Sequence, residues 1–233
     1  GLASYHFRQE KLCNQLLKLA KEDNGGKLRE FLDGGVELEE VDYGVPALVC
    51  ASGYGFVETV AVLLRYGAHV NSCDESGYAP LHAAARKGHC GTMALLLSRG
   101  ASVDLLNKSD RRTALHLATL NGHDDAGRLL IDNHANVNHS DIYGSTPLHL
   151  AARMGRKNTV QLLLEHKADV NHYDNDGWTS LHLAAETGNL TVLSFLLEKN
   201  AHIDCRNKYG RTPLHWAANK GHTHIVAELL KHK

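Results

Sequence analysis

The sequence predicts an all-α fold, a solenoid of helix-turn-helix units. The dipeptide Leu-His recurs in steps of 34, 33, 33 and 33 residues, at Leu81, Leu115, Leu148, Leu181 and Leu214. A glycine follows each copy at about one helix length, and a second apolar pattern follows each glycine. Two short helices cannot bury their apolar rows alone, whereas copies stacked side by side can, so the period itself predicts a repeat architecture.

The first helix of each unit carries start and stop signals. Three threonines are placed to cap it by accepting backbone N–H bonds: Thr146, Thr179 and Thr212. Proline occupies the first helical position in three units, where a missing N–H costs nothing. These prolines are Pro80, Pro147 and Pro213. The glycines expected to end the helix in the left-handed conformation are Gly55, Gly88, Gly122, Gly155, Gly188 and Gly221.

The second helix carries the apolar rows, for example at 160–164 and 192–197. A residue in the left-handed conformation is also expected where this helix ends, and glycine occupies that position at Gly67 and Gly100. Three later units have His134, Lys167 and Asn200 there instead. A left-handed lysine is strained unless the turn changes, so this position is expected to show either strain or a different turn.

The repeated segments resemble those of a known family. "GSTPLHLAARMG", "GRTPLHWAANKG" and "DGWTSLHLAAETG" are each followed by a helix and then by "ADVN" or "AHID", and in this they resemble the ankyrin repeat. The likeness runs from about Leu12 to Lys233. It implies an ankyrin-repeat solenoid whose helix-turn-helix units are linked by β-hairpin loops.

We divide the chain into an N-terminal extension at 1–10 and a repeat domain at 11–233. Its units are expected near 11–41, 42–73, 74–106, 107–140, 141–173, 174–206 and 207–233. The first unit lacks Thr-Pro-Leu-His and is expected to be a cap with a polar outer face. The fourth has one extra residue and Asp110-Arg111 in place of a glycine, so its hairpin tip is expected to differ in shape. The chain starts without Met and stops within a helical pattern, so we expect it to be a piece of a longer protein.

The resemblance implies a concave binding surface, made by the hairpin tips and the exposed side of the first helices. Aromatic and basic side chains predominate at these positions, as they do at the energetic centres of protein interfaces. The predicted partner-binding residues are Tyr43, Tyr54, Tyr78, Arg86, Lys87, Arg112, Tyr143, Arg153, Met154, Trp178, Glu186, Tyr209, Arg211 and Lys220. An alternative is that Trp178 and the tyrosines only shield the hairpin backbones.

The predicted function is therefore protein–protein interaction. Because the surface leans positive, the expected partner is an acidic and partly hydrophobic protein segment. The module would belong to a scaffold, an adaptor or a ubiquitin-ligase substrate receptor. The alternative is a transcriptional regulator that contacts DNA or RNA through the basic C-terminal end, where 206–233 holds six basic and one acidic residue. The whole chain has 25 basic and 26 acidic residues and no basic cluster, which argues against nucleic acid.

The 17 histidines raise the question of metal binding or catalysis. Five of them recur at one position of the unit, at His82, His116, His149, His182 and His215. The resemblance assigns them a buried structural hydrogen bond. His139, His172 and Cys205 share another position and could form a ladder, but neighbouring helices pack 8–10 Å apart while zinc ligands lie about 2.0–2.3 Å from the ion. We predict no metal and no cofactor.

Three asparagines, Asn71, Asn138 and Asn171, occupy the position that asparaginyl hydroxylases modify in similar repeats, so they are candidates for hydroxylation. The chain has no P-loop, His-Glu-x-x-His or Gly-x-Ser-x-Gly motif, so we expect neither an enzyme nor a small-molecule substrate. Five cysteines without a Cys-x-x-Cys pair suit free thiols in a reducing compartment. With no long apolar segment, the expectation is a monomeric, non-membrane domain in the cytoplasm or nucleus.

Overall fold

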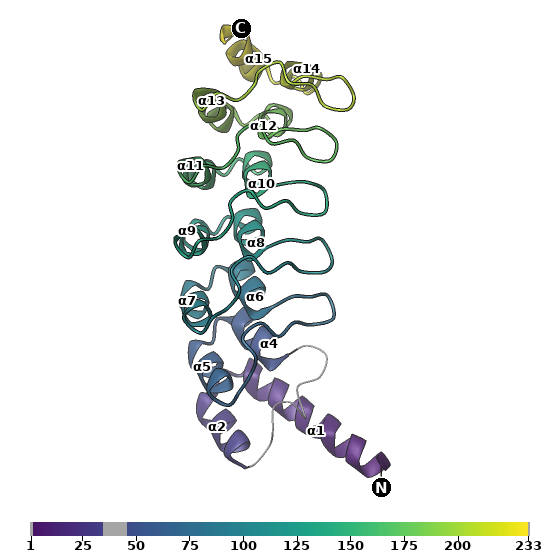
Figure 1. The fold of residues 1–233 in the computed structure, drawn as a ribbon, viewed down its shortest axis with the longest axis vertical. Helices are drawn as coiled ribbons and strands as arrows, with labels where there is room; N and C mark the ends of the chain where they lie inside the picture. The colour runs from purple at the N-terminus through teal and green to yellow at the C-terminus, as the bar shows by residue number, and fades with distance from the viewer. Residues whose placement is uncertain (1, 35–45, 233) are drawn as a thin grey trace. The chain divides into compact units, whose positions relative to one another are not determined.

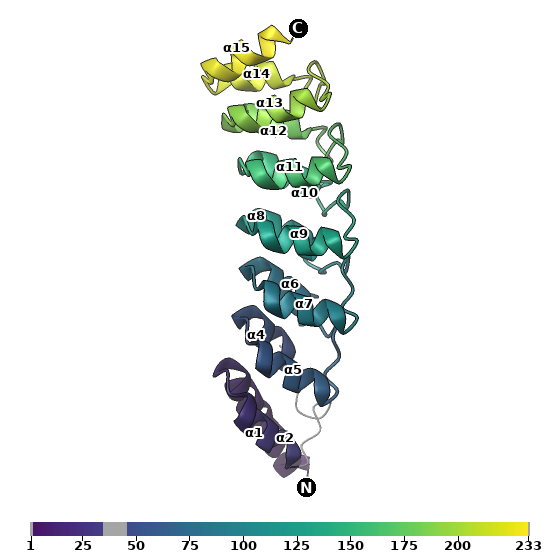
Figure 2. The same cartoon turned by 90° about the vertical axis from the view of Figure 1, so that its left-hand side faces the viewer.

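A computed structural model describes residues 2–34 and 46–232, with side chains throughout these ranges except at 2–10 and 13. Contacts divide the chain into two compact units, 1–109 and 110–233. Both are built from pairs of short helices joined by loops, as Figures 1 and 2 show. The described residues form fourteen helices and no strand, which confirms the all-α repeat architecture. No described helix is long and apolar enough to cross a membrane.

Unit 1 begins with a long helix and continues in pairs. Its helices are α1 (Leu2–Lys21), α2 (Gly25–Asp33), α4 (Ala47–Tyr54), α5 (Val57–Arg65), α6 (Pro80–Lys87) and α7 (Cys90–Ser98). Helix α1 packs on α2 and α4, while α4 packs on α6 and α5 on α7. Because α1 starts at Leu2, the residues expected to form an extension before residue 11 are its first turns.

Unit 2 consists of four helix pairs. They are α8 (Ala114–Asn121) with α9 (Asp124–Asp132), α10 (Pro147–Arg153) with α11 (Lys157–Glu165), α12 (Ser180–Thr187) with α13 (Leu190–Glu198), and α14 (Pro213–Asn219) with α15 (Thr223–Lys231). The first helices pack in the order α8, α10, α12, α14, and the second helices in the order α9, α11, α13, α15. Figure 1 shows the loops on the side of the first helices.

The core of each unit is the seam between stacked pairs. In unit 2, Leu148 on α10, Leu163 on α11 and Leu181 on α12 have no exposed surface. Complete burial of a leucine side chain contributes about 1.5–3 kcal/mol, and these rows repeat in every pair. Stacking therefore supplies the burial that a single pair lacks, as the period predicts.

The predicted ends of the first helices are confirmed. Pro80, Pro147 and Pro213 are the first residues of α6, α10 and α14. The six glycines after the first helices are all left-handed, with φ between 66° and 78°. The second helices end as sharply, because His134, Lys167 and Asn200 take φ of 67°, 65° and 63° where Gly67 and Gly100 stand in unit 1. The left-handed turn is therefore kept without glycine, and of these three residues lysine is the type that adopts it least readily.

The loops are hairpins without strand structure. In unit 2 each closes with a backbone bond across four residues, from Asp141 N–H to the Ser145 carbonyl at 2.9 Å and from Asp174 N–H to the Trp178 carbonyl at 2.9 Å. In the loop with the extra residue, Arg111 is left-handed with φ of 56°. The left-handed position is thus taken by an arginine, a residue type for which this conformation is unfavourable.

Candidate protein-interaction surface

An aspartate or asparagine at the start of each hairpin organises the loop. The Asp174 Oδ1 atom accepts the backbone N–H groups of Asp176 at 2.9 Å and Trp178 at 2.8 Å. Asp141 does the same for Tyr143 and Ser145, and Asn207 for Tyr209 and Arg211. A side chain that replaces backbone partners in this way fixes a loop without a strand ladder.

Neighbouring hairpins are also bonded to one another. In unit 2 the Asn175 N–H donates to the Tyr143 carbonyl at 3.0 Å, and the Lys208 N–H to the Asp176 carbonyl at 2.9 Å. In unit 1 the Lys108 N–H donates to the Ser76 carbonyl at 2.9 Å. The loop tips within a unit therefore form a bonded row, and their outward side chains are held in a fixed spacing.

The recurring histidines tie one repeat to the next. In unit 2, Nε2 of His116, His149 and His182 lies 3.0–3.1 Å from the carbonyl oxygen of the residue before the next capping threonine. The Nδ1 atom of each accepts the backbone N–H of the preceding threonine. In unit 1, His82 instead reaches the Leu105 carbonyl at 2.9 Å, ahead of the loop with the extra residue. The structural role that the resemblance implies thus has a geometric basis.

The threonine caps differ in part from prediction. Thr179 accepts the backbone N–H of His182, as expected. Thr146 and Thr212 make no such bond, and their hydroxyls lie 2.9 and 2.8 Å from Nδ1 of His149 and His215. The same contact is present at Thr179, whose hydroxyl lies 3.0 Å from Nδ1 of His182, so the histidine ring lies against the hydroxyl of all three threonines.

These buried imidazoles are neutral. Burial lowers the pKa of His116 and of His149 to about 4, against the opposing effect of the bond to the carbonyl of Ser145 or Trp178. Burial likewise lowers the pKa of His182. A neutral ring with a proton on Nε2 donates to the next repeat and accepts at Nδ1, which matches both contacts.

The second ladder packs against the first. The rings of His116 and His139 lie 6.4 Å apart and those of His149 and His172 5.8 Å apart, both edge to face. Cys205 Sγ lies 3.7 Å from Nδ1 of His182 at the same place in the next repeat. The described residues hold no group of three His, Cys, Asp or Glu that could bind a metal ion.

One set of ties is not among the features predicted from the sequence. The residue after the inter-helix glycine bonds back to the previous repeat: His89 to the Gly53 carbonyl, Asn189 to the Ala152 carbonyl, and His222 to the Glu186 carbonyl. These residues recur with the same period as the glycines, which is the signal that the sequence offers. Their residue types vary, so no single motif marks the position.

The asparagines predicted as hydroxylation sites form inter-repeat ties. Asn138 Oδ1 accepts the Asp169 N–H at 2.8 Å and its amide donates to the Lys167 carbonyl at 3.3 Å. Asn171 repeats this arrangement in the next step, and Asn71 bonds Ser102 in unit 1. Their amides stabilise the turns between second helices and loops, and their hydroxylation stays a prediction.

The predicted partner-binding residues of unit 1 fall into two groups. Tyr54 is 54% exposed and stacks on Phe56 with ring centroids 5.4 Å apart. Arg86 and Lys87 are exposed at the end of α6, whereas Tyr78 is half-buried against His82. Tyr43 lies outside the described residues.

In unit 2 the predicted residues separate into open and engaged side chains. Arg112 is paired with Asp110 at 2.9 Å and Asp141 at 3.2 Å. Trp178 is half-buried and packs on Trp216 with ring centroids 4.6 Å apart. Glu186 and Lys220 pair with each other at 3.6 Å. These four side chains contact neighbouring repeats, and the alternative that Trp178 only shields the hairpin backbone stays a prediction.

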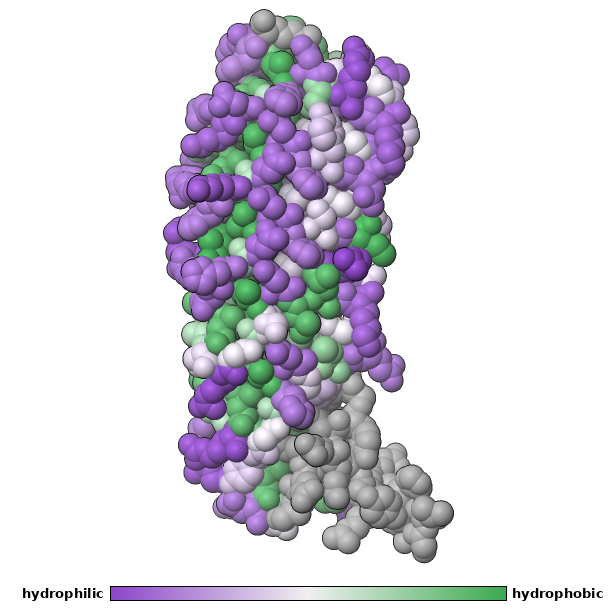
Figure 3. Space-filling model, in the orientation of Figure 1, coloured by the Kyte–Doolittle hydropathy of each residue, from purple (hydrophilic) through white to green (hydrophobic). Residues whose placement is uncertain are grey.

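The open side chains form what we call the recognition surface of unit 2. Tyr143 and Tyr209 are 63% and 66% exposed at equivalent positions of two hairpins, and Met154 is 48% exposed at the end of α10. Arg153 and Arg211 are exposed, and their guanidinium groups form no ion pair with the described residues. Figure 3 shows one face of the molecule, where hydrophobic residues lie between flanking hydrophilic ones within each unit.

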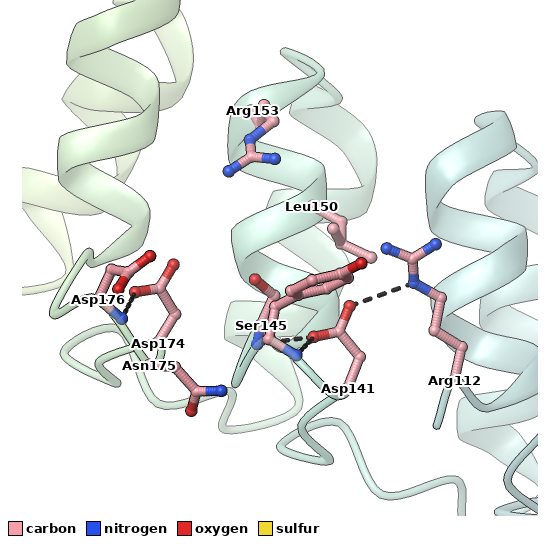
Figure 4. A pocket seen from close by; sticks show the side chains of 9 residues that line it. Arg112, Asp141, Ser145, Leu150, Arg153, Asp174, Asn175 and Asp176 are labelled. Atoms are coloured by element: carbon pink, nitrogen blue, oxygen red, sulfur yellow. Dashed lines mark hydrogen bonds and ion pairs between the residues drawn. The ribbon is translucent and has the colours of Figure 1, made fainter. Parts of the chain in front are cut away.

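A pocket of about 290 Å³ opens on this surface between two hairpins of unit 2. In Figure 4, Arg112 reaches Asp141 on one side, Asp174 and Asp176 lie on the neighbouring loop, and Arg153 extends from α10. The other lining residues are Tyr143, Ser145, Leu150 and Asn175. The pocket therefore combines carboxylates, two guanidinium groups and an exposed aromatic ring.

Comparison with known proteins places this architecture in a family. A family model of ankyrin repeats, in three copies, matches residues 2–107, 99–174 and 168–233. A transient receptor potential cation channel subfamily A member 1 homolog of Caenorhabditis elegans is 31% identical over 112 residues, which cover 48% of this chain and 9% of that protein.

Two further relatives show the same partial likeness. The tyrosine-protein kinase HTK16 of Hydra vulgaris is 29% identical over 142 residues, 58% of this chain and 19% of the kinase. The SMC5-SMC6 complex localization factor protein 1 of Homo sapiens is 40% identical over 76 residues, 32% of this chain and 7% of that protein. The chain spans less than a fifth of each of these three relatives, whose names denote different functions. What it shares with them is the repeat, and this chain belongs to the ankyrin-repeat family.

Proposed function

We propose that the recognition surface of unit 2 binds an acidic and partly hydrophobic segment of a partner protein. Ankyrin repeats are generally protein–protein interaction modules, and the proposal assigns that role to particular residues. Such a module suits a scaffold, an adaptor or a ubiquitin-ligase substrate receptor, because each needs a binding surface rather than chemistry of its own.

The observation that carries the proposal is the pair of exposed tyrosines at equivalent positions of two hairpins of unit 2, together with two arginines that form no ion pair with the described residues. Tyr143 and Tyr209 expose more than half of their surface although their backbones are tightly bonded. Large aromatic side chains held on a rigid backbone lose little conformational entropy when they bind. Arg153 and Arg211 offer planar, bidentate donors to carboxylates of a partner.

Truncation of open side chains tests this proposal. We expect Tyr143→Ala and Arg153→Ala each to weaken binding of a partner protein by about 2 kcal/mol. Truncation of a hot-spot residue lowers the binding free energy by that much or more. Tyr173→Ala and Arg128→Ala are the matched controls, because Tyr173 is 47% exposed and Arg128 is exposed on the second-helix layer. Calorimetric titration of the purified partner gives the comparison. Equal losses for test and control variants, or losses only for the controls, would remove this surface from the interaction.

A further inference from the structure

In unit 2, the residue before one capping threonine contacts the hairpin aspartate of the next repeat. Arg112 precedes Thr113 and bonds Asp141, with its Nε atom 3.2 Å from Oδ2. Asp141 Oδ1 is already occupied by two backbone N–H groups, so the guanidinium satisfies the remaining oxygen. The Asp141 side chain is fully buried by this arrangement. Unit 2 thus contains one complete example of a guanidinium bound to a hairpin carboxylate.

The next repeat has the same carboxylate without the arginine. Asp174 lies 33 residues after Asp141, and its Oδ1 atom accepts two backbone N–H groups in the same way. The residue equivalent to Arg112 is Ser145, which is short and uncharged. No described residue forms an ion pair with Asp174, and Arg153, which lines the same pocket, pairs with neither Asp174 nor Asp176.

One repeat further, the carboxylate itself is replaced. Asn207 makes the same two loop bonds with its amide oxygen, and the residue equivalent to Arg112 is Trp178. A neutral amide needs no counter-ion. Of the three equivalent residues Asp141, Asp174 and Asn207, only Asp174 carries a negative charge that is not paired with an arginine of the described chain. The pocket is lined by this residue.

We propose that this pocket binds the guanidinium group of an arginine presented by the partner protein, with Asp174 receiving it as Asp141 receives Arg112. The inference rests on the proposed function, since it names one side chain of the segment that the recognition surface binds. Asp176 adds a second carboxylate at the pocket, because its contact with Lys208 at 3.8 Å is between two exposed side chains and is therefore weak. Tyr143 supplies an aromatic face on which a guanidinium stacks.

Arg153 indicates which residues would lie next to the bound arginine in the partner segment. Its guanidinium lines the pocket and extends from α10 above the two aspartates in Figure 4. A partner arginine in the pocket therefore places its neighbours beside a cation, which favours an acidic residue next to the arginine. The segment is thus acidic overall, with one arginine that enters the pocket.

A small probe tests the pocket without the partner. We would titrate the ¹⁵N-labelled chain with N-acetyl-L-arginine amide and follow the backbone amides of Asp176 and Trp178, which donate to Asp174. Saturable shifts at these two amides are expected. The neutral isostere N-acetyl-L-citrulline amide should give none, and N-acetyl-L-lysine amide a weaker response, because ammonium lacks the planar fork of guanidinium.

Two variants of the pocket sharpen the test. Asp174→Asn should weaken arginine amide binding by about fivefold or more, since a charge-assisted bond is lost. It should still fold, because Asn207 makes the same loop bonds in the native chain. The control is Asp132→Asn, which removes an equal charge from an exposed site on α9. Ser145→Arg should abolish the response by placing an internal guanidinium on Asp174, whereas Ser145→Ala should leave it unchanged.

The outcomes separate this inference from the proposed function. Absence of saturable shifts in the native chain, or equal shifts with citrulline amide, overturns the arginine pocket even if Arg153→Ala disrupts partner binding. Shifts that survive Asp174→Asn also overturn it. Conversely, a specific arginine response together with partner binding that ignores Tyr143 and Arg153 supports the pocket and contradicts the larger surface.

Discussion

The backbone and the side chain of one repeat position behave in opposite ways in unit 2. The carbonyls of Ser145, Trp178 and Arg211 all accept a hydrogen bond from the Nε2–H group of a buried histidine, at 3.0–3.1 Å. Their side chains share nothing: one is a short hydroxyl beside a pocket, one an indole packed on Trp216, and one an exposed guanidinium. At this position the backbone carbonyl makes the same contact with the previous repeat in all three steps, whereas the side chain differs from one repeat to the next.

The largest expected effect is the loss of stability when the buried histidines between repeats become protonated. The folded pKa of His116 and of His149 is about 4, below the ordinary 6.5, so the unfolded chain binds protons more readily between these values. Their stabilising contribution is fully present above pH 6.5 and is lost as the pH falls from 6.5 to 4. At about 1.4 kcal/mol per pKa unit, the loss is on the order of 3 kcal/mol for each.

Urea denaturation at several pH values measures this loss. Both tryptophans of the chain, Trp178 and Trp216, belong to unit 2, so their fluorescence reports the unit that contains both histidines. His149→Gln should flatten the dependence of the unfolding free energy on pH in this range. His215→Gln is the matched control, because His215 contacts Thr212 in the same way but is exposed. If the control flattened the slope as much as His149→Gln, the buried seam would not be its source.

The next effect compares the seam with the recognition surface directly. Leu148→Ala removes a fully buried side chain from α10 and should lower the unfolding free energy of unit 2 by about 2–5 kcal/mol. Tyr209→Ala removes a larger side chain that is 66% exposed, and should change stability by about 0.5 kcal/mol or less. Denaturation at pH 7 gives both values. A similar loss for both variants would mean that Tyr209 belongs to the fold rather than to binding.

This contrast explains how much the sequence could reveal. The prolines and the left-handed glycines follow from rules that act within a few residues, so helix positions were predictable, whereas the histidine ties were expected from the resemblance to ankyrin repeats. Those features repeat because each unit must fit the next one. The difference between open Arg153 and engaged Arg112 was not predictable, because it depends on whether Asp141 of the next hairpin lies within reach. The resemblance to ankyrin repeats placed both in the same binding surface, because it assigns positions and not partners.

The pocket could not be predicted from the sequence either. Ser145 and Asp174 are ordinary loop residues in the sequence, and only superposing the repeats reveals that a guanidinium is missing between them. Because the repeats are equivalent, the contacts of a residue in one repeat can be compared with those at the same position in another repeat. Departures from the repeat are therefore more informative about function than the repeat itself.

The smallest expected effect concerns the ends of the second helices. Lys167 has φ of 65° at the position that Gly67 and Gly100 occupy in unit 1. A Cβ added to either glycine would meet no atom within 4 Å. The free-energy cost of a side chain at this position therefore comes from the backbone conformation and not from contacts with neighbouring atoms. Lys167→Gly should raise the unfolding free energy by about 1 kcal/mol, the relief of strain outweighing the added freedom of the unfolded chain. Asn200→Gly should gain less, because asparagine tolerates the left-handed conformation. Equal gains at both positions in urea denaturation would show that side-chain identity does not set the strain.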